Sequence, residues 1–235
     1  MDLNRLCFLL VGPSRSGKTA LVKFFLRCLA CERLDPITLN PCDRTCWTCK
    51  LRPETSDHGG LFVTLRAIDT GATGPEVHFL HIDCTKIRTA VDLDDRLNSF
   101  SETTALDGII VAYLDEVHRL VNRSMDETLL KAIEEKPFLW ILSTAKPGPL
   151  EDMLQKRLLK FITELPTSEE LADWLADRCE EWGINYEPEA IIRVVEKSNR
   201  IVGTALHALA LASLDPDEGL TVNLVENDWI VELGE

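Results

Sequence analysis

The sequence predicts an α/β fold, in which helices flank a parallel sheet, followed by a small all-helical domain. Three observations carry this prediction. Uninterrupted apolar runs alternate with amphipathic segments over the first 165 residues, which is typical of a parallel sheet covered on both faces. A glycine-rich phosphate-binding pattern separates the first apolar run from the first helical segment. After Pro166 only helical periodicity remains.

The first part of the chain alternates between strand and helix patterns. Residues 6–11 (LCFLLV) predict a strand buried on both faces, and apolar residues recur at helical spacing from residue 19 onward. Two further strands, over 61–68 and 77–82, either form a hairpin or flank the main sheet. The remaining predicted elements are a helix over 90–100, a strand over 108–114, a helix over 125–135 and a strand over 138–142.

A lid of three helices is predicted after this α/β part. The helices are expected over 168–182, 187–197 and 203–213, and Ser168 is a suitable N-cap for the first of them. Strand-like patches follow at 220–225 (LTVNLV) and 229–233 (WIVEL). The expected parts are a core over 1–165 with a cysteine-rich module at 28–50, a lid over 166–213 and a tail over 214–235.

Composition and charge exclude several classes of protein. With 45% hydrophobic and 27% charged residues among 235, the chain is globular rather than disordered. It has neither the run of about 18 apolar residues that a membrane helix needs nor a signal peptide at its start, so we expect it in the cytoplasm.

The 39 acidic and 25 basic residues give a net charge of -14, so any nucleic-acid contact needs a local basic surface. The basic groups, each of which also fits an ordinary solvated surface, are Arg44, Lys50 and Arg52, then Lys86 and Arg88, then Lys156, Arg157 and Lys160.

The glycine-rich segment at 12–19, GPSRSGKT, matches a phosphate-binding loop that follows a strand and precedes a helix. Gly12 and Gly17 let backbone amides turn toward phosphates, and the helix N-terminus adds positive potential there. Lys18 would reach the outer phosphates, and the Thr19 hydroxyl would bind Mg²⁺. The residues predicted to contact the nucleotide are Gly12, Pro13, Ser14, Arg15, Ser16, Gly17, Lys18, Thr19, Ala20 and Asp115.

Two carboxylates follow the most strand-like run of the chain. The run at 108–114 (GIIVAYL) leads directly into Asp115 and Glu116, so both emerge at the carboxyl end of a buried strand, where open parallel sheets place their ligands. Asp115 would complete the Mg²⁺ shell, and Glu116 would polarise the water that attacks the terminal phosphate.

Five of the eight cysteines fall within 22 residues, which indicates a metal site rather than disulfides. They are Cys28, Cys31, Cys42, Cys46 and Cys49. The last three form a compact knuckle that Cys31 completes as a closed, structural Zn²⁺ site. Cys28, one helical turn before Cys31, could replace it, and His58 is a more distant candidate. The other cysteines, expected to be buried thiols, are Cys7, Cys84 and Cys179.

The acidic motif and its surroundings resemble a known family. LDEVHRL (114–120) and LLKAIEEKP (129–137) look like the Walker B region of the bacterial DNA polymerase III clamp-loader ATPase subunits, of the gamma/tau and delta-prime type, which belong to the AAA+ class. In that family a four-cysteine zinc module lies between the phosphate-loop helix and the next strand, where residues 31–49 lie here. The resemblance also includes 81–97 and 166–171 and covers roughly 6–213.

The resemblance implies an ATPase with ATP, Mg²⁺ and Zn²⁺ as its ligands. It implies that Arg157 is an arginine finger for the nucleotide of a neighbouring subunit, so that hydrolysis needs assembly. The family's serine-arginine-cysteine is changed here to lysine-arginine-leucine around Arg157. Thr144 falls near the position of the first sensor, whereas Leu206 stands where the family has the arginine of the second sensor. That second sensor is therefore expected to be lost.

Two parts of the family pattern have no counterpart in the sequence, namely the segment before the first core strand and the helical collar. We expect either assembly by other contacts or a reduced relative from a phage or mobile element.

The function that the resemblance implies is a clamp-loader-like ATPase acting as an oligomer in DNA replication or recombination. Its implied partners are other AAA+ subunits, DNA through a local basic surface, and a sliding clamp or another replication protein. The alternatives are a nucleotide-responsive adaptor with weak hydrolysis and a target-selecting ATPase of a mobile element.

Overall fold

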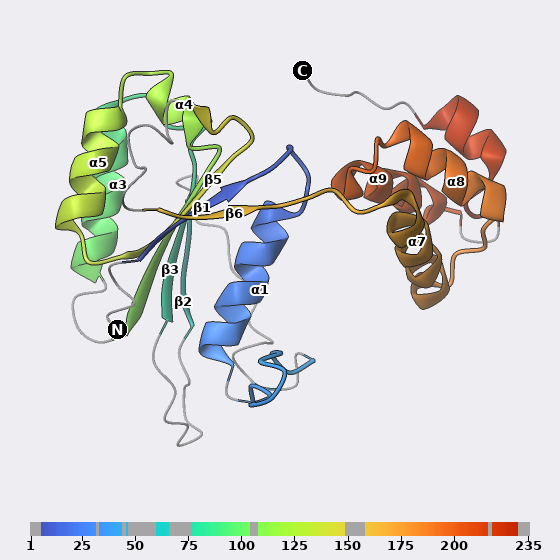
Figure 1. The fold of residues 1–235 in the computed structure, drawn as a ribbon, viewed down its shortest axis with the longest axis horizontal. Helices are drawn as coiled ribbons and strands as arrows, with labels where there is room; N and C mark the ends of the chain where they lie inside the picture. Colours follow the sequence, from blue (N-terminus) through green and yellow to red (C-terminus); the bar gives the residue numbers. More distant parts are fainter. Residues whose placement is uncertain are drawn as a thin grey trace. The chain divides into compact units, whose positions relative to one another are not determined.

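The chain divides into two compact units, both of which are drawn in Figure 1. One consists of Met1–Gly12 and Lys18–Ile162, and the other of Pro13–Gly17 and Thr163–Glu235. Their structure comes from a computed structural model, which describes residues 6–31, 33–43, 46, 60–65, 77–103, 108–148, 158–215 and 218–229. In these segments no helix is long and apolar enough to cross a membrane.

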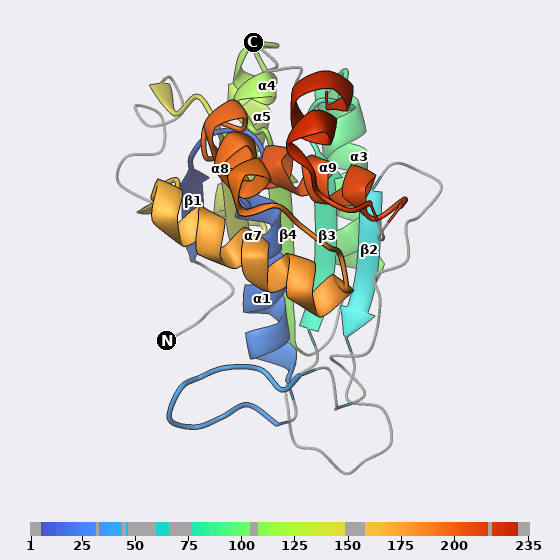
Figure 2. The ribbon, with the colours of Figure 1, turned by 90° about the vertical axis from the view of Figure 1, so that its right-hand side faces the viewer.

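A six-stranded sheet forms the centre of the first unit, with the strand order β2-β3-β4-β5-β1-β6. Neighbouring strands are parallel except β2, which runs antiparallel to β3. Figure 2 shows β4, β3 and β2 side by side in this order. The parallel sheet is thus confirmed, and the two strands whose arrangement the sequence left open form an antiparallel pair at one edge. The strands are β1 (Cys7–Val11), β2 (Gly60–Leu65), β3 (Val77–Asp83), β4 (Ile109–Asp115), β5 (Leu139–Thr144) and β6 (Leu159–Ile162).

Helices cover both faces of this sheet. On one face lie α3 (Ala90–Thr103) and α5 (Asp126–Glu135), and on the other lies α1 (Lys18–Ala30) (Figure 1). A short helix, α4 (His118–Val121), follows β4. Successive side chains of a strand point to opposite faces, so β4 sends Ala112 and Leu114 into one core and Val111 and Tyr113 into the other.

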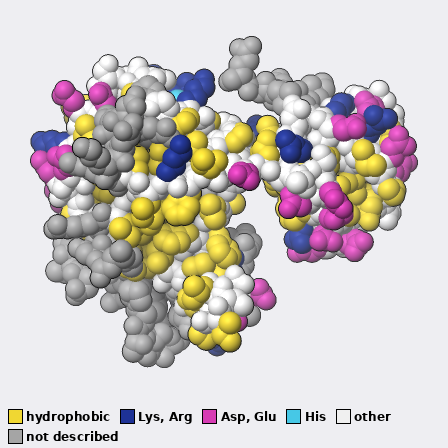
Figure 3. All heavy atoms as spheres, viewed as in Figure 1, with side chains coloured by type: hydrophobic (Ala, Val, Ile, Leu, Met, Phe, Trp, Pro, Cys, Tyr) yellow, Lys and Arg dark blue, Asp and Glu magenta, His cyan; other side chains and the backbone are white. Residues whose placement is uncertain are grey.

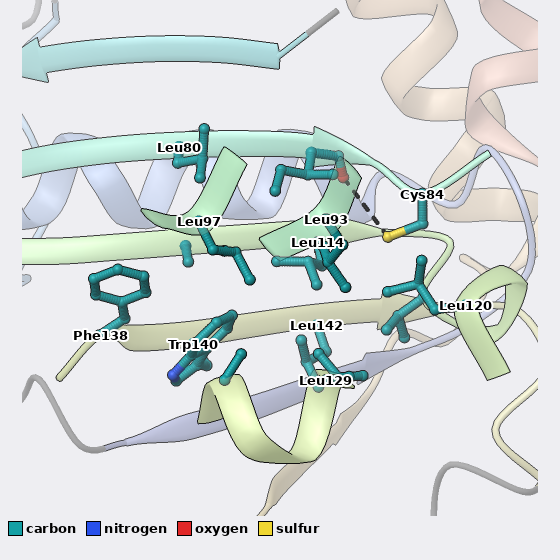
Figure 4. Packing of buried hydrophobic residues seen from close by; sticks show 14 of the residues in the cluster. Leu80, Cys84, Leu93, Leu97, Leu114, Leu120, Leu129, Phe138, Trp140 and Leu142 are labelled. Carbon is teal, nitrogen blue, oxygen red and sulfur yellow. Dashed lines mark hydrogen bonds between the residues drawn. The ribbon is translucent and has the colours of Figure 1, made fainter. Parts of the chain in front are cut away.

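The core beneath α3 and α5 is shown in Figure 4. Leu93 and Leu97 of α3 and Leu129 of α5 meet the sheet there, and all three are fully buried. Phe138 and Trp140 pack against each other in the same core, with ring centroids 5.3 Å apart. Each such large apolar side chain contributes roughly 1.5–3 kcal/mol to folding by leaving water.

The second unit is built mainly of three helices, α7 (Ser168–Trp182), α8 (Pro188–Lys197) and α9 (Val202–Ala212). These confirm the three helices predicted from the sequence, but the N-cap of α7 is Thr167 and not Ser168. The Thr167 hydroxyl accepts a hydrogen bond from the Glu170 amide, and the Glu170 carboxylate accepts one from the Thr167 amide. This reciprocal pair is a capping box.

The segment after α9 also packs into the second unit. Leu220, Val225 and Trp229 are buried in its core. The strand predicted over 220–225 is wrong, because Leu224–Asp228 forms a π-helical turn (η2) and only Leu220 makes a β-bridge, with Tyr186. The apolar residues of this segment are instead buried against the helices of the second unit. Of the second strand-like patch, 229–233, only Trp229 belongs to the described residues.

Candidate nucleotide site and cysteine cluster

The predicted nucleotide-binding motifs meet at one edge of the sheet. Strand register pairs Val11 of β1 with Thr144 of β5 and Asp83 of β3 with Asp115 of β4, so these strands end together. The amide of Gly12, the first loop residue, donates to the Thr144 carbonyl at 3.1 Å. This edge is where parallel sheets place their ligands.

Lys18 is the first residue of α1 and is only 5% exposed. Its ammonium donates to the Gly12 carbonyl at 2.9 Å, across the loop. Burial lowers the pKa of Lys18, and the negative charges of Glu116 and Asp115 act in the opposite direction. These two carboxylates are therefore within electrostatic range of the lysine.

The middle of the loop, Pro13–Gly17, belongs to the second unit. Within it Arg15 has a left-handed backbone (φ 61°), and the Arg15 carbonyl accepts a 3.1 Å hydrogen bond from the amide of Gly203. A Cβ added to Gly203 would lie 2.8 Å from the Cβ of Arg15, so only glycine fits this close approach. The predicted contact residues that are exposed are Pro13, Ser14, Arg15, Gly17 and Ala20.

The two residues predicted to bind Mg²⁺ lie side by side. Thr19 Oγ1 is 3.4 Å from Asp115 Oδ2 and 3.1 Å from the phenol oxygen of Tyr113. Tyr113 donates to Ser143 Oγ at 3.2 Å, and Ser143 donates in turn to the Asp115 carboxylate. Burial and the nearby Asp115 charge raise the pKa of Tyr113, which keeps the phenol protonated as a donor. Sequence reasoning missed Tyr113 and Ser143.

Glu116 and Thr144 meet at a third side chain. Glu116 Oε2 lies 3.2 Å from His118 Nδ1, and the same nitrogen lies 3.1 Å from Thr144 Oγ1. His118 and Thr144 are both buried. Glu116 itself has a left-handed backbone (φ 54°), which is uncommon for a residue other than glycine. Within the first unit the structure thus places Lys18, Thr19, Asp115, Glu116 and Thr144 at one edge of the sheet. The predicted arginine finger, Arg157, lies outside the described residues.

The cysteine-rich segment brings three of its thiols together. The Sγ atoms of Cys31, Cys42 and Cys46 all lie within 4.8 Å of one another. The Cys42 amide donates to Cys31 Sγ at 3.3 Å, and the Cys46 amide donates to Cys42 Sγ at 3.4 Å. Sulfurs bound to one Zn²⁺ lie about 3.8 Å apart, given Zn–S bonds of about 2.3 Å in a tetrahedron. The three thiols therefore fit a shared metal ion.

The fourth predicted ligand, Cys49, lies outside the described residues, as does His58. Cys28 is not among the three grouped thiols. Cys7, Cys84 and Cys179 are buried as expected, and burial raises the pKa of Cys7 to about 12. None of the described cysteines forms a disulfide.

The predicted basic groups are only partly described. Lys86, Arg88 and Lys160 are exposed, and Lys86 pairs with Asp83 at 3.5 Å. The other five basic residues named for a nucleic-acid surface lie outside the described part of the chain. On α9, Leu206 is half-buried at the position where the resemblance implies an arginine.

Comparisons with known proteins show similarity over most of the chain. No protein-family model matches the chain. Over 204 residues the chain is 26% identical to DNA polymerase III subunit gamma of Buchnera aphidicola subsp. Schizaphis graminum (strain Sg), covering 86% of this chain and 50% of that protein. This chain therefore spans half the length of that relative.

Two solved structures of RuvB mutants from Thermotoga maritima have a similar fold. Each superimposes with a TM-score of 0.52, at 16% and 17% identity, over 94% and 93% of this chain and 60% and 59% of the RuvB chains. At such low identity this likeness concerns the fold alone. The chain is thus similar in sequence to a DNA polymerase III subunit and in fold to RuvB.

Proposed function

We propose that the chain binds ATP with Mg²⁺ and hydrolyses it, as a clamp-loader-like AAA+ ATPase of DNA replication or recombination. One observation carries the proposal: the two nucleotide-binding motifs meet, with Thr19 of the phosphate loop 3.4 Å from Asp115 at the end of β4. A hydroxyl and a carboxylate are the hard oxygen donors that Mg²⁺ accepts, so this pair fits the ion.

Each residue of the site has a role that follows from its charge and position. Lys18 would neutralise the outer phosphates, and bound Mg²⁺ would further reduce the charge on the phosphate oxygens. Asp115 and Thr19 would hold the ion. Glu116 would accept a hydrogen bond from the attacking water and polarise it. Thr144, fully buried at the end of β5, would serve as the first sensor.

Assembly with further subunits belongs to the same proposal. Arg157 would reach the nucleotide of a neighbouring subunit and stabilise charge on the transferred phosphate. The partners would be other AAA+ subunits, DNA and a sliding clamp or another replication protein. Support comes from the sequence similarity to a DNA polymerase III subunit. A rate of hydrolysis per chain that rises with protein concentration is the expected sign of assembly.

We also propose a structural Zn²⁺ site made of Cys31, Cys42, Cys46 and Cys49. The closeness of the first three thiols supports it, as do the backbone amides that donate to two of the sulfurs. Such amides stabilise thiolate, which is the form that binds the metal. A full set of cysteine ligands leaves no open coordination position for a reaction.

The first test is the rate of ATP hydrolysis by Glu116→Ala. Because a positioned base contributes at least about 100-fold to such reactions, we expect the rate to fall by about that factor. Glu127→Ala, which removes an exposed carboxylate from the first turn of α5, is the matched control and should keep the wild-type rate. Equal rates for Glu116→Ala and the wild type would contradict the role of Glu116.

A second function, that of a nucleotide-responsive adaptor, is favoured by one observation. Leu206 of α9 offers no charge to a phosphate at the position where the resemblance implies an arginine. Tight ATP binding with negligible hydrolysis by the wild type, even with DNA and partner proteins present, would select the adaptor over the ATPase.

A further inference from the structure

His118 has no part in the roles proposed so far, yet it contacts two of the residues that have one. Its Nδ1 atom lies 3.2 Å from Glu116 Oε2 and 3.1 Å from Thr144 Oγ1. The His118 side chain is 9% exposed, so water competes little for these contacts. All three residues belong to the first unit, at the ends of β4 and β5 and the start of α4.

The hydrogen-bond partners determine where the ring carries its proton. An ionised carboxylate can only accept, so Nδ1 must donate to Glu116. The Thr144 hydroxyl donates to the Lys146 carbonyl at 3.1 Å and accepts from the Lys146 amide at 3.0 Å. Thr144 Oγ1 therefore faces Nδ1 as a second acceptor. Both neighbours favour the tautomer with hydrogen on Nδ1, and together they fix the orientation of the ring.

The backbone beside Glu116 is also fixed. The Val117 amide donates to the Ser143 carbonyl at 2.9 Å, and the Arg119 amide donates to the Glu116 carbonyl at 2.9 Å. Glu116 has the left-handed φ of 54° that a residue other than glycine keeps only where its surroundings hold it. The carboxylate acts electrostatically on Lys18 as well as on His118. Through its contact with Oε2, His118 is placed to direct the carboxylate.

We propose that His118 is a positioning residue, whose Nδ1–H holds the Glu116 carboxylate in the direction from which it polarises the attacking water. The inference rests on the proposed ATPase function. Since His118 contacts the carboxylate and Thr144, its loss should slow turnover and leave the affinity for ATP unchanged. A side chain that supplies an N–H at the same place should restore turnover.

The test compares His118→Leu with His118→Asn, by kcat for ATP and by the Kd of a fluorescent ATP analogue. We expect kcat of His118→Leu to fall at least about tenfold, as for other residues that orient a catalytic group, with Kd within about twofold of wild type. The asparagine amide can donate near the position of Nδ1, so His118→Asn should recover most of kcat. His78→Leu is the control, because His78 is equally buried (8% exposed) and lies at the opposite end of β3 from Asp83.

Two results would overturn the proposal. One is a wild-type kcat in His118→Leu. The other is an equal loss in His118→Asn and His118→Leu, which would assign the effect to packing rather than to the hydrogen bond.

A nitrogen NMR spectrum of His118 gives a readout that needs neither turnover nor a folded leucine variant. The Nδ1–H tautomer in the wild type, with its preference reduced in Glu116→Ala, supports the proposal. The opposite tautomer in the wild type overturns it. Absence of hydrolysis by the wild type would instead count against the ATPase function, and the spectrum would then decide the role of His118 separately.

Discussion

Asp115 is oriented by hydroxyl groups on both sides of its carboxylate. Ser143 donates to one oxygen, and Thr19 lies 3.4 Å from the other. Tyr113 connects Thr19 and Ser143 through its phenol. Orientation before the ligand arrives is what a Mg²⁺ site needs, because its ligands must take an octahedral arrangement. Tyr113 and Ser143 are thus supporting residues of the site.

Asp115 is predictable from the sequence, but the hydroxyls around it are less so. Tyr113 stands within an apolar run and Ser143 directly follows one, so the sequence pattern assigns both to the core. A signal was nonetheless present, since a hydroxyl in a fully buried strand must find a hydrogen-bond partner. His118 carried a similar signal as a polar residue two positions after Glu116.

Thr167 provides a prediction at the scale of one side chain. Its hydroxyl caps α7, so Thr167→Ala should lower the free energy of unfolding by ~1 kcal/mol, measured by urea denaturation. Ser168→Ala is the control, because Ser168 is the first residue of the helix and not its cap. A larger loss in Ser168→Ala than in Thr167→Ala would contradict the assignment of the cap.

The stability that this capping box contributes depends on pH, because it includes the carboxylate of Glu170. The hydrogen bond from the Thr167 amide lowers the pKa of Glu170 in the folded chain. A group whose pKa is lowered on folding stabilises the fold above its ordinary pKa, and this contribution disappears as pH falls through the lowered value. The loss of unfolding free energy in Glu170→Ala, measured by urea denaturation, should therefore be largest near neutral pH and smaller in acid.

Among the elements, β6 shows where sequence patterns fail. The sequence pattern predicts no strand over 159–162, although three of these four residues are apolar. All four are exposed on the edge of the sheet, so no alternation between buried and exposed positions marks the strand. Its pairing with β1 depends on residues more than 140 positions away in the chain.

The segment after α1 provides a prediction about metal. If Cys31 is a ligand and Cys28 is not, Cys31→Ser should lose the zinc that the wild-type chain carries, about one ion per chain, while Cys28→Ser keeps it. Elemental analysis of the purified variants measures this directly. Zinc retained in Cys31→Ser but lost in Cys28→Ser would reverse the assignment, and a wild-type chain without zinc would contradict the site.

At the scale of the molecule, the repeated pattern of strand and helix was enough to predict the parallel sheet. The phosphate loop predicts which edge of that sheet binds the ligand. The order of the strands was not predictable in this way, because local patterns contain no information on which strands become neighbours. The segment 220–229 shows the same limit, since its apolar residues are buried by helices distant in sequence.

The surface has two further features at this scale. On the face shown in Figure 3, acidic side chains gather over the second unit, in keeping with a net charge of -14. Apolar side chains gather over the first unit, where Leu21 and Phe24 of α1 and Phe161 of β6 are exposed. Exposed apolar surface of this kind is typical of contact sites, and it fits the proposed assembly with other subunits.

The most direct test of the central claim, a nucleotide site built by the phosphate loop and the end of β4, is the binding of ATP with Mg²⁺ to wild type, Lys18→Ala and Lys23→Ala. Lys23 is the exposed lysine of the same helix and serves as the matched control. Loss of a charged hydrogen bond to phosphate weakens binding by roughly 1.5–3 kcal/mol, so Lys18→Ala should raise Kd at least about tenfold. Lys23→Ala should bind as the wild type does. Equal affinity in Lys18→Ala and wild type, or no binding by the wild type, would contradict the account.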